Sequence, residues 1–186
     1  MSRLLAMVFL LGLSGCAASY RNVPLPEVDL CQSFPLVGLG QPEDGLFHRA
    51  LYDAQAAADS MGYSISCSLT PSDTPLTAEV SIRLGESHCD MRFNEDAVRT
   101  GFRSHGRYTT VALFGHEIGH VISTMETNTF PPYQESQLFS DRVAGRVLRV
   151  LGVDRQEFNE VVEWFDARGA ERTAAFIGGY EECDHE

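Results

Sequence analysis

Metal-binding and proton-transferring side chains occur together in the middle of the chain, in the pentapeptide His116-Glu117-Ile118-Gly119-His120. An α-helix turns once in about 3.6 residues, so His116 and His120, four positions apart, point to the same side. Two imidazoles on one face can hold a single metal ion, and a neighbouring carboxylate can take a proton from a water that the metal activates. The spacing therefore predicts metal-assisted hydrolysis, with His116 and His120 as ligands and Glu117 as general base.

The residues around this pentapeptide are apolar, which predicts that its helix is buried. A metal-free structural cluster of two histidines and one glutamate is the alternative interpretation. Burying two imidazoles and a carboxylate without partners costs free energy, so the metal site is the favoured hypothesis.

The segment from Tyr108 to Leu151, which contains the HExxH motif, resembles the zincin metallopeptidases. The resemblance implies a catalytic Zn²⁺ bound by His116 and His120, with Glu117 as general base and a third protein ligand downstream. It also implies an edge strand beside the active helix, on which an extended peptide or protein substrate adds. Residues 88–93 are the candidate for that strand.

The identity of the third ligand decides the subclass of zincin. In metzincins it lies six residues after the second histidine, at Glu126 here, but Ser123 stands where that pattern needs a glycine. The segment from Ser140 to Gly145 looks like the end of the gluzincin pattern Glu-x-x-Ala-Asp-x-x-Ala-Gly. The glutamate of that pattern would fall at Gln137, and glutamine is a rare zinc ligand.

Two carboxylates nearby are candidates for the third ligand in place of Gln137. Asp141 is preferred, because it shares a helix face with Gln137 and with Gly145, whose small size allows close packing on the HExxH helix. Glu135 is the other candidate. Alternatively, Asp141 accepts a hydrogen bond from a ligating histidine, and Glu135 is a solvated residue at a helix start.

Two tyrosines flank the motif and have hydroxyl groups that suit a tetrahedral oxyanion, namely Tyr108 and Tyr133. The more common role for such residues is packing.

Hydrophobic periodicity and turn residues predict an α+β domain, a small antiparallel sheet packed on the HExxH helix and further C-terminal helices, as in zincins. Strands are expected at 63–69, 77–84 and 88–93, and helices at 44–61, 109–124, 134–151, 155–168 and 170–176. Thr109 or Thr110 is the expected N-cap of the HExxH helix, and Asp154 with Glu157 forms a capping box. The segment 94–106 is ambiguous.

The N-terminus has the composition of an export signal. Residues 1–15 combine an arginine, a short apolar run and small residues, as in a secretory signal peptide. The tetrad ending at Cys16 resembles the bacterial lipobox, which implies lipidation of Cys16, a tether over 16–30 and a single domain over 31–186. By the same resemblance, the protein belongs at the outer membrane, facing the periplasm. An ordinary signal peptide cleaved near Ala17 is the alternative.

Four further cysteines, an even number in an exported chain, predict two disulfides. Cys67 and Cys89 lie in neighbouring strand-like segments and are the preferred pair, which leaves Cys31 with Cys183. Four free thiols are the alternative.

The net charge of the 186-residue chain is −12, which argues against nucleic acid as a partner. The expected function is that of an envelope-anchored zinc metallopeptidase. The alternative is an envelope lipoprotein that binds a metal or a partner protein without catalysis, and Gln137 at the glutamate position favours it.

Overall fold

The computed structural model describes residues 45–74 and 76–182, and the predicted roles of Cys16, Cys31 and Cys183 lie outside these residues. The described chain forms six helices and three strands, which confirms the α+β class. In chain order they are α1 (Leu46–Ser60), β1 (Ser66–Pro71), β2 (Ala78–Ile82), β3 (His88–Phe93), α2 (Glu95–His105), α3 (Tyr108–Thr127), α4 (Tyr133–Val150), α5 (Arg155–Asp166) and α6 (Ala170–Glu181).

The three strands form a mixed sheet of order β1-β3-β2. β2 and β3 pair as an antiparallel hairpin, whereas β1 joins the other side of β3 and runs parallel to it. The prediction of an antiparallel sheet was therefore wrong. Alternating apolar residues identify a strand and its buried face, but they do not identify its neighbour or its direction.

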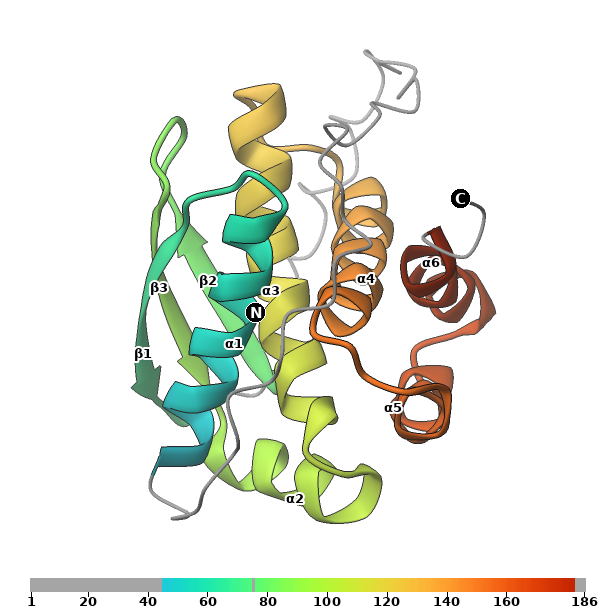
Figure 1. Ribbon diagram of the computed structural model, residues 1–186. Helices are drawn as coiled ribbons and strands as arrows, with labels where there is room; N and C mark the ends of the chain where they lie inside the picture. Colours follow the sequence, from blue (N-terminus) through green and yellow to red (C-terminus); the bar gives the residue numbers. More distant parts are fainter. Residues whose placement is uncertain (1–44, 75, 183–186) are drawn as a thin grey trace, which may run out of the picture.

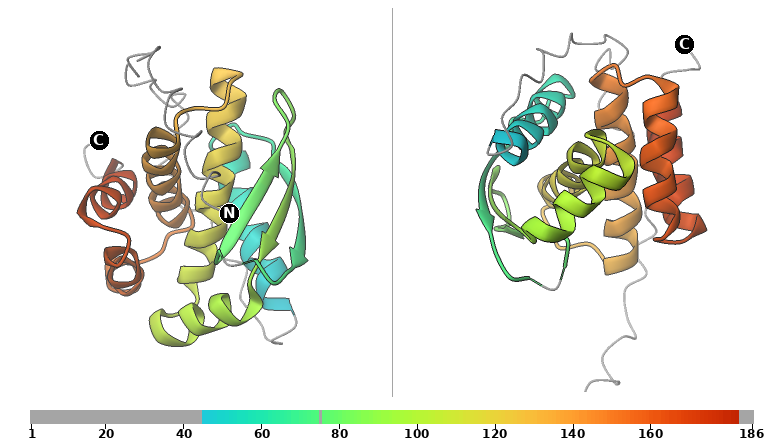
Figure 2. Two further views of the ribbon diagram at one scale, coloured as in Figure 1. Left: turned by 180° about the vertical axis from the view of Figure 1, so that it is seen from behind. Right: turned by 90° about the horizontal axis from the view of Figure 1, so that it is seen from below.

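The sheet buries one face. Along β3, Cys89, Met91 and Phe93 are buried and the residues between them are exposed. Helices α1 and α3 cover the buried face (Figures 1 and 2). Helix α4 packs on α3, and α5 and α6 lie beyond α4 on the side away from the sheet (Figure 2).

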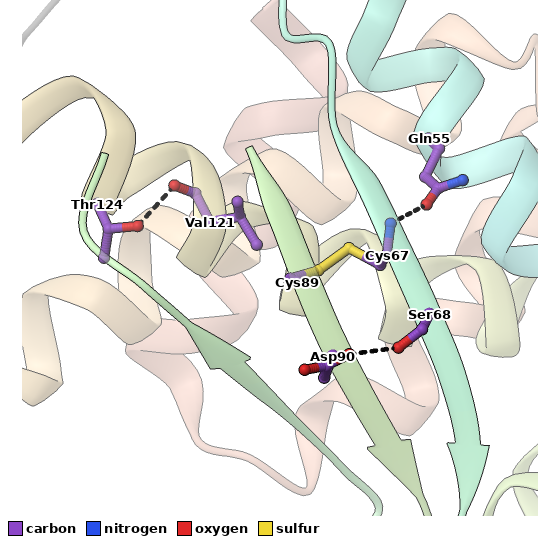
Figure 3. The surroundings of a disulfide bond; sticks show 7 residues. All are labelled: Gln55, Cys67, Ser68, Cys89, Asp90, Val121 and Thr124. Carbon is purple, nitrogen blue, oxygen red and sulfur yellow. Dashed lines mark hydrogen bonds between the residues drawn. A yellow bond between two sulfur atoms is a disulfide. The ribbon is translucent and has the colours of Figure 1, made fainter. Parts of the chain in front are cut away.

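A disulfide joins β1 to β3 through Cys67 and Cys89, as predicted (Figure 3). The two residues are direct neighbours across the parallel pair, with their Cα atoms 4.5 Å apart. One residue further along, the Ser68 hydroxyl donates a 2.6 Å hydrogen bond to Asp90. The backbone amide of Cys67 donates to the side chain of Gln55 at 2.7 Å, which ties this strand to α1.

Glycines bring the helices around α4 into close contact. A Cβ at Gly119 of α3 would lie 2.6 Å from the Cα of Ser140, so this glycine sets the approach of α3 to α4. A Cβ at Gly145 would lie 2.0 Å from the carbonyl oxygen of Phe176 in α6. Gly145 thus faces α6 and not the HExxH helix, contrary to expectation.

Several predicted helix ends need correction. α6 continues through Gly178 and Gly179 to Glu181, where a shorter helix was expected. Its packing on α4 explains the glycines, since a Cβ at Gly179 would lie 1.9 Å from the carbonyl oxygen of Arg142. α3 begins at Tyr108, so Thr109 and Thr110 are inside the helix and do not cap it.

Two caps at helix starts are formed by side chains. The ambiguous segment 94–106 contains α2, which Asn94 caps by accepting a hydrogen bond from the amide of Ala97. The Asp154 cap of α5 is confirmed, because its carboxylate accepts from the amide of Glu157 at 2.9 Å.

Among the described residues, no helix has the length and apolar character needed to span a membrane.

Candidate metal-binding and catalytic site

Helix α3 presents His116, Glu117 and His120 to one cleft of about 720 Å³. The two imidazole rings lie 4.8 Å apart between centroids, so they share one side of the helix, as their spacing predicts. Because α3 is buried, His116 and Glu117 are only 3% and 6% exposed. The other side chains that line the cleft come from the β2 segment, the α3–α4 connection, α4, the α5–α6 connection and the start of α6. They include Leu76, Glu79, Val80, Phe130, Tyr133, Ser136, Gln137, Arg168 and Arg172.

Each imidazole has a polar side chain close to its Nδ1 atom. Nδ1 of His116 lies 2.9 Å from Oδ1 of Asp141, and Nδ1 of His120 lies 2.7 Å from the hydroxyl of Ser136. Ligating histidines commonly make such contacts through one nitrogen, which fixes the ring and leaves Nε2 for the metal. Burial lowers the pKa of both rings, to about 3 for His120, where His116 lowers it further. Both are thus neutral at pH 7, the protonation state that binds a metal.

The fully buried carboxylate of Asp141 is surrounded by cationic and imidazole donors. Arg172 donates to Oδ2 at 2.6 Å and to Oδ1 at 2.8 Å, and Oδ1 also faces His116. Burial alone would raise the pKa of Asp141, but the hydrogen bonds from Arg172 and His116 lower it. This position suits the outer role considered for Asp141, in which it accepts a hydrogen bond from a ligating histidine.

The remaining candidates for a third ligand have different surroundings. Glu135 lies in the first turn of α4 and is not among the residues that line the cleft. Glu126 lies within α3 and accepts a hydrogen bond from Tyr63. Gln137 does line the cleft, and its amide nitrogen lies 3.2 Å from Nε2 of His120. Over residues 45–74 and 76–182, no three His, Cys, Asp or Glu side chains are grouped to hold a metal.

The carboxyl group of Glu117 titrates near neutrality. Burial raises its pKa to about 7, against the opposing charge of Arg168. A general base works best when its pKa lies near the operating pH. The position beside the two histidines and the raised pKa are both suited to accepting a proton from water.

Arg168 and Arg172 line the cleft, and the sequence analysis did not identify them. Arg172 is 31 residues from its partner Asp141, and their contact depends on how α6 packs against α4. Arginines in this segment have no periodicity or motif that would distinguish them from solvated residues. Only the packing of the helices reveals them.

The two flanking tyrosines have different surroundings. Tyr133 is 79% exposed and lines the cleft. Tyr108 is buried, its hydroxyl accepts a hydrogen bond from Arg107 at 2.6 Å, and it is not among the cleft-lining residues. Of the two, Tyr133 has access to a molecule in the cleft.

The strand beside the cleft is β2 and not the expected segment 88–93. That segment is β3, which is the central strand and pairs on both sides. β2 is an edge strand, and Ala78, Glu79, Val80 and Ile82 line the cleft with the histidines. The sequence could not distinguish the two, because strand order depends on β1 joining β3.

Two of the side chains, His116 and His120, suit a single divalent ion such as Zn²⁺ as ligands. Two neutral imidazoles, each with a polar side chain close to Nδ1, are typical ligands, and the side chain next to them, Gln137, is an amide where a carboxylate is usual. No protein-family model, curated protein or solved structure matches this chain.

Proposed function

We propose that this protein is a zinc-dependent metallopeptidase. The observation that supports the proposal best is the pair of neutral imidazoles on one side of α3, each with a polar side chain close to Nδ1, next to a buried carboxyl group in an open cleft. A purely structural cluster has no need of a cleft.

The metal would be held by Nε2 of His116 and of His120. We favour the amide oxygen of Gln137 as the third ligand, which needs only a rotation of the amide group, because the oxygens of Asp141 already accept from Arg172. Asp141 and Glu135 stay as the carboxylate alternatives. Such an ion would supply a Lewis acid, which polarises a carbonyl and makes water more acidic.

The protein's own groups supply the proton transfer and the substrate contacts. Glu117 accepts the proton of the attacking water and passes it to the leaving amine. The edge strand β2 runs beside the cleft, and an extended peptide adds to it through main-chain hydrogen bonds. Tyr133 is the available hydroxyl for an oxyanion.

A second function deserves the same test, because Gln137 is neutral and glutamine is a rare zinc ligand. In this hypothesis the chain binds a metal or a partner protein at the cell envelope without catalysis. We further propose, from the N-terminal sequence, that the protein is lipid-anchored at the outer membrane and faces the periplasm, whichever of the two functions it has.

The test measures zinc and hydrolysis together. Purified protein lacking residues 1–16 is expected to hold about one Zn²⁺ per chain and to cleave peptides from a broad library. E117Q should keep the zinc and lose about 10²- to 10⁴-fold in rate, because glutamine has a similar shape but cannot accept the proton. The double variant H116A/H120A should lose the zinc.

The two functions differ in the outcome. Full zinc occupancy without hydrolysis of any peptide would favour the binding protein over the peptidase. Unchanged zinc in H116A/H120A would refute the proposed metal site, and with it the peptidase. The zinc affinities of four variants identify the third ligand. If Gln137 is the ligand, Q137E should bind zinc more tightly than wild type and Q137A more weakly. If a carboxylate is the ligand instead, D141N or E135Q should weaken zinc binding, depending on which of the two residues binds the metal.

A further inference from the structure

The guanidinium of Arg168 lies at the cleft without a close hydrogen-bond acceptor. Arg168 follows α5, and its side chain is 18% exposed. The guanidinium carbon lies 4.3 Å from the ring centroid of Trp164 and 4.6 Å from that of Phe165, so two aromatic rings support it. The rings hold the group in place but accept no conventional hydrogen bonds from it.

The carboxylate beside Arg168, that of Asp141, already accepts hydrogen bonds from another arginine. Nη1 of Arg168 lies 4.0 Å from Oδ1 of Asp141, beyond hydrogen-bonding distance, and both Asp141 oxygens accept from Arg172. Within the described part of the chain, the guanidinium of Arg168 makes no hydrogen bond, although its backbone amide donates to the carbonyl oxygen of Phe165 at 2.8 Å. A guanidinium has five N–H donors, and no nitrogen of Arg168 is among the buried side-chain atoms that lack a partner, so its unpaired donors are accessible to a molecule in the cleft.

Two arginines lie at this end of the cleft, and Arg172 makes the close hydrogen bonds to Asp141. Arg168 and Arg172 are two cations that share one buried carboxylate, Asp141. Glu79 and Glu117 also line the cleft, and the net charge of the chain is −12. A cation held at a cleft in an acidic protein is placed to attract one anionic group.

We propose that Arg168 binds a carboxylate of the substrate close to the peptide bond that is cleaved. This inference rests on the proposed peptidase function, since Arg168 lines the same cleft as His116 and Glu117. The planar fork of arginine matches the two oxygens of a carboxylate. Glu79 and Glu117 in the cleft disfavour a more highly charged anion such as phosphate.

A peptide offers a carboxylate from two sources, its C-terminus or an aspartate or glutamate side chain. Both present the same chemistry to Arg168. The substrates must therefore come in matched sets: peptides with a free acid or an amide at the C-terminus, and peptides with internal Glu or Gln.

The test compares wild type with R168Q, R168K and the control R83Q, which removes one exposed arginine elsewhere on the surface. R168Q should lower kcat/KM for the carboxylate-bearing set by about 10- to 100-fold, as expected for a charge-assisted hydrogen bond, and leave the neutral sets nearly unchanged. R168K keeps the positive charge but not the planar fork of donors. Its kcat/KM for the carboxylate-bearing peptides should therefore lie between the values for wild type and R168Q. R83Q should behave as wild type.

Binding can be measured without turnover, because Trp164 is the single tryptophan and lies under Arg168. In the E117Q background, titration with the preferred free-acid or glutamate peptide should change the tryptophan fluorescence. The double variant E117Q/R168Q should bind this peptide about 10- to 100-fold more weakly than E117Q does. The amide or glutamine peptide should bind weakly and with equal affinity to E117Q and to E117Q/R168Q.

The outcomes separate this inference from the proposed function. Equal losses of R168Q on charged and neutral peptides would overturn it, since Arg168 would then act on the scissile carbonyl or on the fold. Hydrolysis without any carboxylate preference would overturn it while the peptidase stands. Arg168-dependent binding of a carboxylate peptide that is never cleaved would support it and refute the peptidase. If R168Q does not fold, the R168K comparison decides the same question.

Discussion

At the residue scale, the ionisation of Glu117 opposes folding. Its pKa is about 7 in the folded protein and 4.5 in the absence of burial. Between these values the folded state binds a proton that the unfolded state has released, so stability falls as the pH rises. The loss is absent below pH 4.5 and complete above pH 7, where it amounts to about 3 kcal/mol.

We therefore predict that E117Q stabilises the metal-free protein in a pH-dependent way. Glutamine has no charge to desolvate, so the variant should exceed wild type by up to about 3 kcal/mol at pH 8 and by about 1 kcal/mol at pH 5. Urea unfolding with a chelator present measures both values. Other titrating groups act alike in the two proteins and cancel. A difference that does not change with pH would contradict the burial of an ionised Glu117.

Part of the candidate site could be predicted from the sequence, and part could not. His116, Glu117 and His120 lie on one helix, so their spacing alone predicts their common side. The surroundings of Asp141 depend on Arg172, which reaches it from another helix. No local pattern encodes such a contact, and the sequence therefore left the role of Asp141 open.

At the scale of elements, the distance between α4 and α6 positions Arg172 against Asp141. Gly145 and Gly179 lie at this helix pair, and a Cβ on either would approach a backbone carbonyl oxygen of the other helix to within 2.0 Å. Backbone atoms cannot move aside as a flexible side chain does. Glycine is therefore required at both positions.

Two adjacent glycines of α6 allow a matched test of this packing. A Cβ at Gly178 meets nothing within 4 Å, whereas one at Gly179 lies 1.9 Å from the Arg142 carbonyl oxygen. G178A should stabilise the protein by about 1 kcal/mol through helix propensity. G179A should destabilise it by about 1–3 kcal/mol or more through overpacking. Thermal unfolding of the pair checks both signs, and equal effects would mean that α6 does not pack closely on α4.

The elements themselves were predicted unevenly, for identifiable reasons. Long amphipathic segments such as α1 and α4 were found, with ends close to those expected. α2 stayed ambiguous because only Val98 and Gly101 of its eleven residues are buried, so its apolar face is weak. α6 was predicted too short because glycines normally end helices, and here tertiary packing outweighs that preference.

At the scale of the whole molecule, the disulfide bears on the proposed periplasmic location. The Cys67–Cys89 disulfide joins β1 to the central strand and closes a loop that contains β2 (Figure 3). Disulfides of this kind persist in oxidising compartments such as the periplasm. The same compartment is proposed from residues 1–15 and Cys16, which lie outside the described part of the structure.

One variant of Cys16 tests the lipid anchor and the compartment of the disulfide together. With Cys16→Ala, lipid labelling should be lost and the protein should move from the membrane fraction to the soluble or precursor fraction, because the cysteine that receives the lipid is gone. The exported part of the variant should still contain the Cys67–Cys89 bond, seen as a mass shift on alkylation only after reduction, since oxidation depends on the compartment and not on the lipid. Continued lipid labelling would refute the lipobox. Free thiols at Cys67 and Cys89 in the wild type would place the protein in a reducing compartment and refute export altogether.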